Sequence, residues 1–180
     1  MDHLSIYKAA LFVLAAALVG IGVFALRLNS GNLEKFEPLP RNRIAGGIFT
    51  FVALLWCVPQ VRPIIWTSWL PLLYPLVIVC TFLAVAYLDY LLSRGFGGFM
   101  ILAAYYFVHA SFTYHTAGAP FFAVLCWVMG IVGIFFSGKP YLMRDLIRKC
   151  SLSSGWRFGT AAYCFIFALS ALVAGILHLS

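Results

Sequence analysis

Long runs of apolar residues, separated by short polar breaks, make up most of the chain. Six of these runs approach or reach the length that a helix needs to cross the hydrocarbon layer of a bilayer, which is roughly 30 Å thick. They cover residues 9–26, 44–61, 70–92, 97–114, 121–136 and 158–177. The pattern predicts an all-α fold: a polytopic transmembrane helical bundle with six spans in a single integral membrane domain, residues 1–180.

The breaks between the runs carry residues that end helices. The first break, residues 27–43, contains several Asn, Gly and Pro residues. The fourth break is harder to place because residues 95–138 contain no Asp, Glu, Lys or Arg, although this stretch is far longer than one span needs. Residues 115–120 have the most turn-like composition within it, and we expect them to separate the fourth and fifth spans.

Residues 139–150 follow a different pattern, with apolar and charged residues on opposite sides of a helical wheel. The apolar side holds Leu142, Leu146, Ile147 and Cys150, and the charged residues are Arg144, Asp145, Arg148 and Lys149. Basic amphipathic helices of this kind lie in the plane of a membrane surface. We therefore expect a short interfacial helix at 139–150, resting on the inner leaflet.

A short similarity recurs at a constant offset of 51 residues. Residues 43–48 read RIAGGI and residues 94–99 read RGFGGF, each at the start of a predicted span, and a looser version begins at Arg157. The recurrence is consistent with three helical hairpins in a row. The alternative is that an arginine followed by small residues is simply what helix starts at an inner leaflet prefer.

The composition agrees with a membrane protein and excludes an ordinary soluble domain. Of the 180 residues, 64% are hydrophobic and only 9% are charged, whereas about a quarter of a soluble domain is charged. A net charge of +7 would favour nucleic acid as the partner of a soluble protein, but here the basic residues flank apolar spans. The lipid bilayer with its anionic inner leaflet is the simpler partner, and we expect no nucleic acid.

The basic residues also predict the orientation of the chain. If the six spans alternate, ten of the 12 Lys and Arg residues fall on one side, and only Lys8 and Arg62 fall on the other. Short loops rich in Lys and Arg remain cytoplasmic. We therefore expect a multi-pass protein of the cell (inner) membrane with both termini on the non-cytoplasmic side.

Small residues recur within the spans. Glycines occur in pairs, as at Gly46 and Gly47 or Gly97 and Gly98, and such positions let helix backbones approach closely. The five cysteines are scattered singly without metal or redox spacing, so we interpret them as packing residues.

The span at 97–114 carries a polar stripe. Tyr105, His109 and Thr113 are spaced by four residues and share one helical face, with His109 past the bilayer midplane. One hypothesis is a cofactor site, in which His109 is a haem ligand or part of a quinone pocket. No motif supports either cofactor, and we favour an interior His109 that hydrogen-bonds a neighbouring helix.

Two further polar groups have alternative interpretations. His109, His115 and His178 all fall on the outer half of the predicted bundle and would form a metal site if they converged. Asp89 is the only acid within an apolar run, near the inner end of the span at 70–92. It is either an acid that reaches out to the basic loops or a carboxylate that couples proton or cation movement.

Catalytic motifs are missing from the sequence. It contains no GxSxG, HExxH or glycine-rich phosphate loop, and five acids leave little for acid–base or metal-dependent catalysis. We therefore expect a non-catalytic subunit or scaffold that packs against a larger membrane protein or forms a homo-oligomer. The alternatives are a haem- or quinone-binding redox subunit centred on His109 and a small ion- or proton-coupled transporter that uses Asp89.

Overall fold

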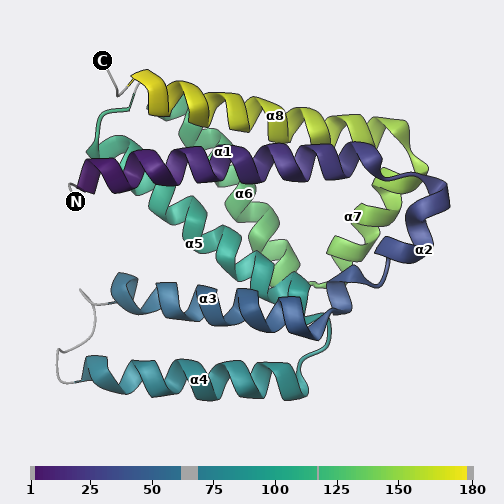
Figure 1. The fold of residues 1–180 in the computed structure, drawn as a ribbon, viewed down its shortest axis with the longest axis horizontal. Helices are drawn as coiled ribbons and strands as arrows, with labels where there is room; N and C mark the ends of the chain where they lie inside the picture. Colours follow the sequence, from purple (N-terminus) through teal and green to yellow (C-terminus); the bar gives the residue numbers. More distant parts are fainter. Residues whose placement is uncertain (1–2, 62–68, 117, 178–180) are drawn as a thin grey trace. The chain divides into compact units, whose positions relative to one another are not determined.

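Helices account for almost all of the chain in the computed structural model, which describes residues 3–61, 69–116 and 118–177. The long helices are α1 (His3–Arg27), α3 (Arg43–Val61), α4 (Leu70–Tyr87), α5 (Leu91–Thr113), α6 (Ala119–Gly138) and α8 (Ser154–Leu177) (Figure 1). The shorter elements are η1 (Ser30–Asn32), α2 (Leu33–Phe36), η2 (Leu39–Arg41) and α7 (Tyr141–Leu152). No strand occurs within these described ranges.

Most of the predicted elements are present. Among the described residues, six helices are long and apolar enough to cross a membrane, which confirms the number expected from the sequence. The break between α5 and α6 falls where composition placed it, since α5 ends at Thr113 and α6 begins at Ala119. The amphipathic segment also forms its expected helix, α7.

The break between α4 and α5 differs from the prediction, which continued the third span to residue 92. Instead, α4 ends at Tyr87 and α5 begins at Leu91. Between them Tyr90 has a φ of 56°, a left-handed conformation that costs a non-glycine residue roughly 1–2 kcal/mol. The Arg41 guanidinium lies 5.2 Å from the centroid of the Tyr90 ring and helps to hold it. Hydropathy could not reveal this break because apolar residues continue on both sides of it.

The chain divides into two compact units. The first comprises Met1–Phe36, Tyr105–Val128 and Leu146–Ser180, and the second comprises Glu37–Ala104 and Met129–Asp145. The helices α5, α6 and α7 contribute residues to both. Each unit therefore combines segments that are far apart in the sequence.

In the first unit, α1 and α8 run side by side in opposite directions (Figure 1). Glycines allow this close approach. A Cβ added to Gly22 would lie 3.1 Å from the ring of Phe165, and one added to Gly175 would lie 3.3 Å from the ring of Phe12. Aromatic rings of one helix thus fill the space that glycines leave on the other.

Aromatic side chains also fill the core of the first unit. Phe122 makes edge-to-face contacts with Phe107 and Phe167, at centroid distances of 6.3 and 5.6 Å. Tyr7 is fully buried, and its hydroxyl shares a hydrogen bond of 3.1 Å with Oγ1 of Thr116. Both of these buried hydroxyls are therefore hydrogen-bonded, as buried polar groups generally are.

The C-terminal part of α7 packs against the end of α1 in the first unit. The buried residues of this cluster are Leu28, Ile147 and Cys150, with Phe24, Phe36 and Leu146 packed around them. Three of the four apolar residues that the sequence assigned to the lipid surface thus contact protein, so their assignment to lipid is corrected. A helical wheel of 139–150 alone does not show that α1 and α2 supply apolar partners.

In the second unit, α3 and α4 run antiparallel and pack together (Figure 1). The start of α3 lies against α5, because a Cβ added to Gly46 would collide with the backbone of Leu91 and Leu92. The contact between α5 and α6 is equally close, since a Cβ added to Gly97 would lie 2.6 Å from the carbonyl oxygen of Gly133. Glycine is required at both crossings.

The three predicted hairpins stay a prediction. Within the units, α1 pairs with α8 and α3 pairs with α4, and α5 approaches both α3 and α6 closely. The recurring sequences also occupy unequal positions, because Arg43 is the first residue of α3 and Arg94 is the fourth residue of α5. The similarity therefore does not mark equivalent helix starts.

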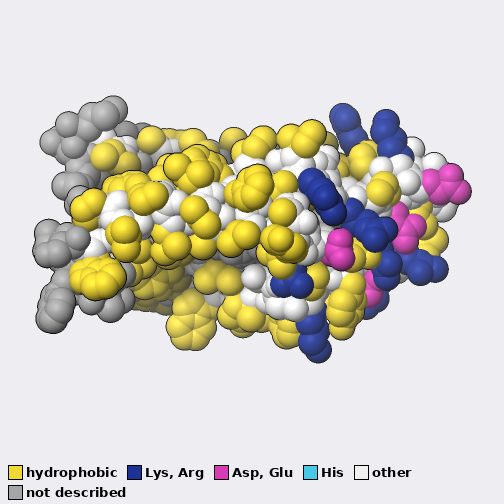
Figure 2. Space-filling model, turned by 90° about the horizontal axis from the view of Figure 1, so that it is seen from below, with side chains coloured by type: hydrophobic (Ala, Val, Ile, Leu, Met, Phe, Trp, Pro, Cys, Tyr) yellow, Lys and Arg dark blue, Asp and Glu magenta, His cyan; other side chains and the backbone are white. Residues whose placement is uncertain are grey.

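Basic side chains gather at one end of the helices within each unit. In the first unit, Nη1 of Arg157 donates to the carbonyl oxygen of Leu28 after the end of α1, at 2.9 Å. In the second unit, Nη1 of Arg94 donates to the carbonyl oxygen of Ser137 near the end of α6, at 3.1 Å. Each arginine satisfies a carbonyl that a helix end leaves free. Figure 2 shows hydrophobic side chains along the helices, with Lys and Arg side chains gathered at helix ends.

Candidate functional site

The predicted polar stripe lies on an exposed face of α5 in the first unit. Tyr105, His109 and Thr113 are all exposed, and 60% of Tyr105 is accessible. The rings of Tyr105 and His109 stack with their centroids 6.1 Å apart. The Thr113 hydroxyl donates to the carbonyl oxygen of His109 at 2.9 Å. The three side chains therefore form a continuous polar strip along one helix face.

The opposite face of α5 packs into the first unit. Phe107, Ala110 and Ser111 are buried there, and the Ser111 hydroxyl donates to a carbonyl of its own helix at 2.8 Å. This arrangement corrects the prediction that His109 is an interior group bound to a neighbouring helix. Because most of α5 is apolar, hydropathy does not show which of its faces is buried. The buried face is instead the one whose small and aromatic side chains fit the core.

The His109 imidazole retains its hydrogen-bonding capacity. Within the described part of the chain it contacts the Tyr105 ring but makes no hydrogen bond. A neutral imidazole carries one donor and one acceptor, and a phenol or hydroxyl carries both. The stripe can therefore bind a surface that presents matching donors and acceptors.

The position of His109 along α5 places it at hydrocarbon depth if the helix crosses a bilayer. Arg94, whose guanidinium reaches the end of α6, marks one end of α5. His109 lies 15 residues further on, about 22 Å at 1.5 Å per residue, within a hydrocarbon layer of roughly 30 Å. A polar side chain at this depth is costly unless it is covered.

Sequence reasoning missed one residue of this surface. Phe112 is 52% exposed and lies seven residues after Tyr105, so the two share a face. It was missed because a phenylalanine in an apolar run gives no signal of its own. The heptad spacing from Tyr105 would have indicated its place beside His109.

The candidate metal site is not assembled by the described residues. His115 is exposed in the turn after α5, with a φ of 49°, and His178 lies outside the described residues. No group of three or more His, Cys, Asp or Glu side chains suited to a metal ion occurs in the described ranges. A site formed by His109, His115 and His178 therefore stays a prediction.

Asp89 lies in the connection between α4 and α5 and is exposed. Its placement inside an apolar span is therefore corrected, because the helix ends two residues before it. The neighbouring Tyr90 ring contacts Arg41. Asp89 thus belongs to a charged connection, and its coupling role stays a prediction.

Charged groups of the second unit also surround this connection. Arg144 donates to the carboxylate of Asp145 at 3.3 Å, and this hydrogen bond raises the pKa of Arg144 further above its ordinary value. Nε of Arg94 and Nε of Arg144 are both buried without a hydrogen-bond partner among the described residues. Arg94 lies in the first turn of α5 and Arg144 in the first turn of α7, so these basic groups lie at helix ends.

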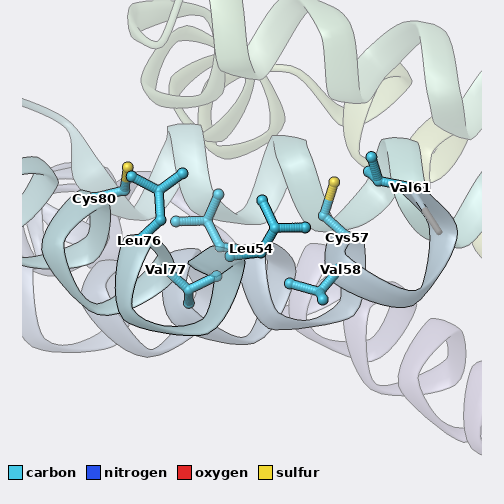
Figure 3. A pocket seen from close by; sticks show the side chains of 8 residues that line it. Leu54, Cys57, Val58, Val61, Leu76, Val77 and Cys80 are labelled. Carbon is cyan, nitrogen blue, oxygen red and sulfur yellow. The ribbon is translucent and has the colours of Figure 1, made fainter. Parts of the chain in front are cut away.

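An apolar hollow of about 130 Å³ lies between α3 and α4 in the second unit. It is lined by Leu54, Cys57, Val58, Val61, Leu73, Leu76, Val77 and Cys80 (Figure 3). Ligand sites combine apolar walls with a few well-placed polar groups. Thiols are only weak hydrogen-bonding groups, so this lining does not supply the haem or quinone site that the sequence left open.

Comparison with known proteins adds no relative. No family model, no curated protein and no solved structure matches this chain.

Proposed function

We propose that the protein is a multi-pass membrane protein with a non-catalytic role, a subunit or scaffold that packs against a membrane partner through the polar stripe of α5. The six long apolar helices support the membrane assignment. The exposed stripe is the observation that carries the proposed role. Facing hydrocarbon, Tyr105 and His109 would lack hydrogen-bond partners, whereas a partner helix with polar groups at the same depth provides them.

The chemistry of the stripe suits binding better than catalysis. It offers hydrogen-bond donors and acceptors, and such groups join helices in membranes by about 0.6–2 kcal/mol per hydrogen bond. Catalysis would need several groups in complementary roles that converge on one reacting atom. A stripe along a single helix face is instead suited to contact another helix along its length.

The proposed orientation follows from the basic helix ends. In each unit, an arginine that binds a helix carbonyl lies at a helix end with another basic residue. Arg157 binds Leu28, which follows Arg27 at the end of α1, and Arg94 binds Ser137, two residues before Lys139 at the end of α6. Lys- and Arg-rich loops stay in the cytoplasm. We therefore assign these ends to the cytoplasmic side of the inner membrane, beside the anionic leaflet, and both termini to the opposite side.

Photo-crosslinking in native membranes tests the proposed contact. A benzophenone amino acid replaces Phe112, which is 52% exposed beside the stripe, or Val124, a matched control on α6 that is 57% exposed. We expect the probe at Phe112 to form adducts with protein and the probe at Val124 to label lipid only. Lipid-only products at both positions would refute the proposed function.

The accessible His109 imidazole favours a redox subunit as the second candidate. A free ring nitrogen on an exposed face is able to ligate iron if a partner supplies the rest of the pocket. The visible spectrum of the protein purified from membranes decides between the candidates. A haem band that disappears in His109→Ala would replace the scaffold role with the redox role.

A further inference from the structure

The polar stripe is complementary to itself. Tyr105 and His109 each carry both a hydrogen-bond donor and an acceptor. The Thr113 hydroxyl donates to the carbonyl oxygen of His109, and its oxygen can still accept a hydrogen bond. An identical stripe can therefore satisfy all three side chains. The stripe contains no Asp, Glu, Lys or Arg, so two copies of it do not bring like charges of these residues together.

The orientation of the chain determines which residues can meet. Two copies in one membrane share the same cytoplasmic side, so a dimer must place its two α5 helices parallel. A two-fold axis along the membrane normal brings equal depths together. His109 then lies opposite His109, with Tyr105 about one turn away.

The spacing along α5 matches that of a parallel helix pair. Tyr105, His109 and Phe112 follow one another at intervals of four and three residues, and all three are exposed in the first unit. This is the a/d spacing of helices that cross at about 20°. A single polar a or d residue such as His109 fixes the register of such a pair.

We propose that the partner of the α5 stripe is a second copy of this chain, bound as a parallel two-fold dimer with His109 pairing across the axis. This inference rests on the proposed function, because it names the partner of the same surface. The pairing joins the donor of one imidazole to the acceptor of the other. Tyr105 and Phe112 pack on either side of that hydrogen bond.

Disulfide crosslinking between copies tests the dimer. Phe112→Cys, oxidised in native membranes, should give a product of twice the mass of the 19.9 kDa chain. Val124→Cys, on α6 and 57% exposed, is the control of similar exposure, and the unchanged chain measures the background from the five native thiols. We expect at least ten times more dimer from Phe112→Cys than from Val124→Cys.

Substitutions at His109 separate a specific contact from chance collision. Adding His109→Leu to Phe112→Cys should reduce the dimer several-fold, and His109→Gln should retain most of it because an amide also supplies a donor and an acceptor. Two differently tagged copies of the unchanged chain should co-purify in mild detergent. That measurement does not depend on the folding of any variant.

The outcomes distinguish the two proposals. If the tagged copies do not co-purify and the probe at Phe112 forms adducts only with a protein of another mass, the second copy is refuted and the proposed function stands. If neither a dimer nor any protein adduct forms, both fail. Equal disulfide yields at Phe112 and Val124 would also overturn the dimer.

Discussion

At the scale of single residues, the close contact of α5 with α6 depends on Gly97. A Cβ there would lie 2.6 Å from the carbonyl oxygen of Gly133 and 2.8 Å from the backbone nitrogen of Ser137, neither of which can rotate away. We expect Gly97→Ala to lower the free energy of unfolding by about 1–3 kcal/mol, as overpacking does. The melting temperature of the detergent-solubilised protein measures this loss.

Gly159→Ala is the matched control for that substitution. Gly159 is also a helical glycine, and a Cβ there would meet nothing within 4 Å. Little change in the melting temperature is therefore expected. Equal melting temperatures for the two variants would contradict the close contact of α5 with α6.

The sequence predicted which residues share a helix face more reliably than it predicted whether that face is buried or exposed. Gly97 and Gly98 are adjacent and equally small, yet only Gly97 lies at a helix crossing. The four-residue spacing likewise placed Tyr105 and His109 on one face of α5 but could not show that this face points outward. Direction depends on which side chains fit the core, and an apolar sequence does not encode that choice in its hydropathy.

At the scale of elements, the C-terminal part of α7 makes apolar contacts within the first unit, and we expect these contacts to hold it more firmly than its charges do. Ile147 is 6% exposed and packs beside Leu28 in the first unit. Ile147→Ala should release the C-terminal part of α7, because removing a buried isoleucine costs about 2–5 kcal/mol. Limited proteolysis in inverted membrane vesicles should then cut this segment faster.

A variant in which the basic residues Arg144, Arg148 and Lys149 are neutralised together is compared with Ile147→Ala. Surface attraction of about 1 kcal/mol per charge is lost, while the apolar cluster remains. We expect protease resistance close to that of the unchanged chain. Faster cleavage of the neutralised variant than of Ile147→Ala would show that lipid, not protein, holds α7.

Helix boundaries were predictable only where composition changes at them. Residues 115–120 combine turn-forming and polar residues, and the α5–α6 break lies there. The α4–α5 break depends on the left-handed conformation of Tyr90 and its contact with Arg41, which join residues 49 positions apart. A local pattern cannot reveal a break that a distant side chain helps to hold.

At the scale of the whole molecule, the basic helix ends predict the membrane orientation. Cysteines introduced at Asn32 and Ser153 should be shielded from an impermeant reagent applied outside, and one at Pro120 should react. Thr116 is a poorer outer probe because it is buried against Tyr7, whereas Pro120 is exposed at the start of α6. Labelling of Ser153 from outside would invert the proposed orientation.

The pairing of α1 with α8 also determines when the first unit can form. A ribosome delivers helices in chain order, and compact units generally fold as they emerge. All residues of the second unit have been made once Asp145 is reached, whereas α1 pairs with α8, which follows Asp145 in the chain. Four other long helices, α3, α4, α5 and α6, are therefore synthesised between α1 and its partner.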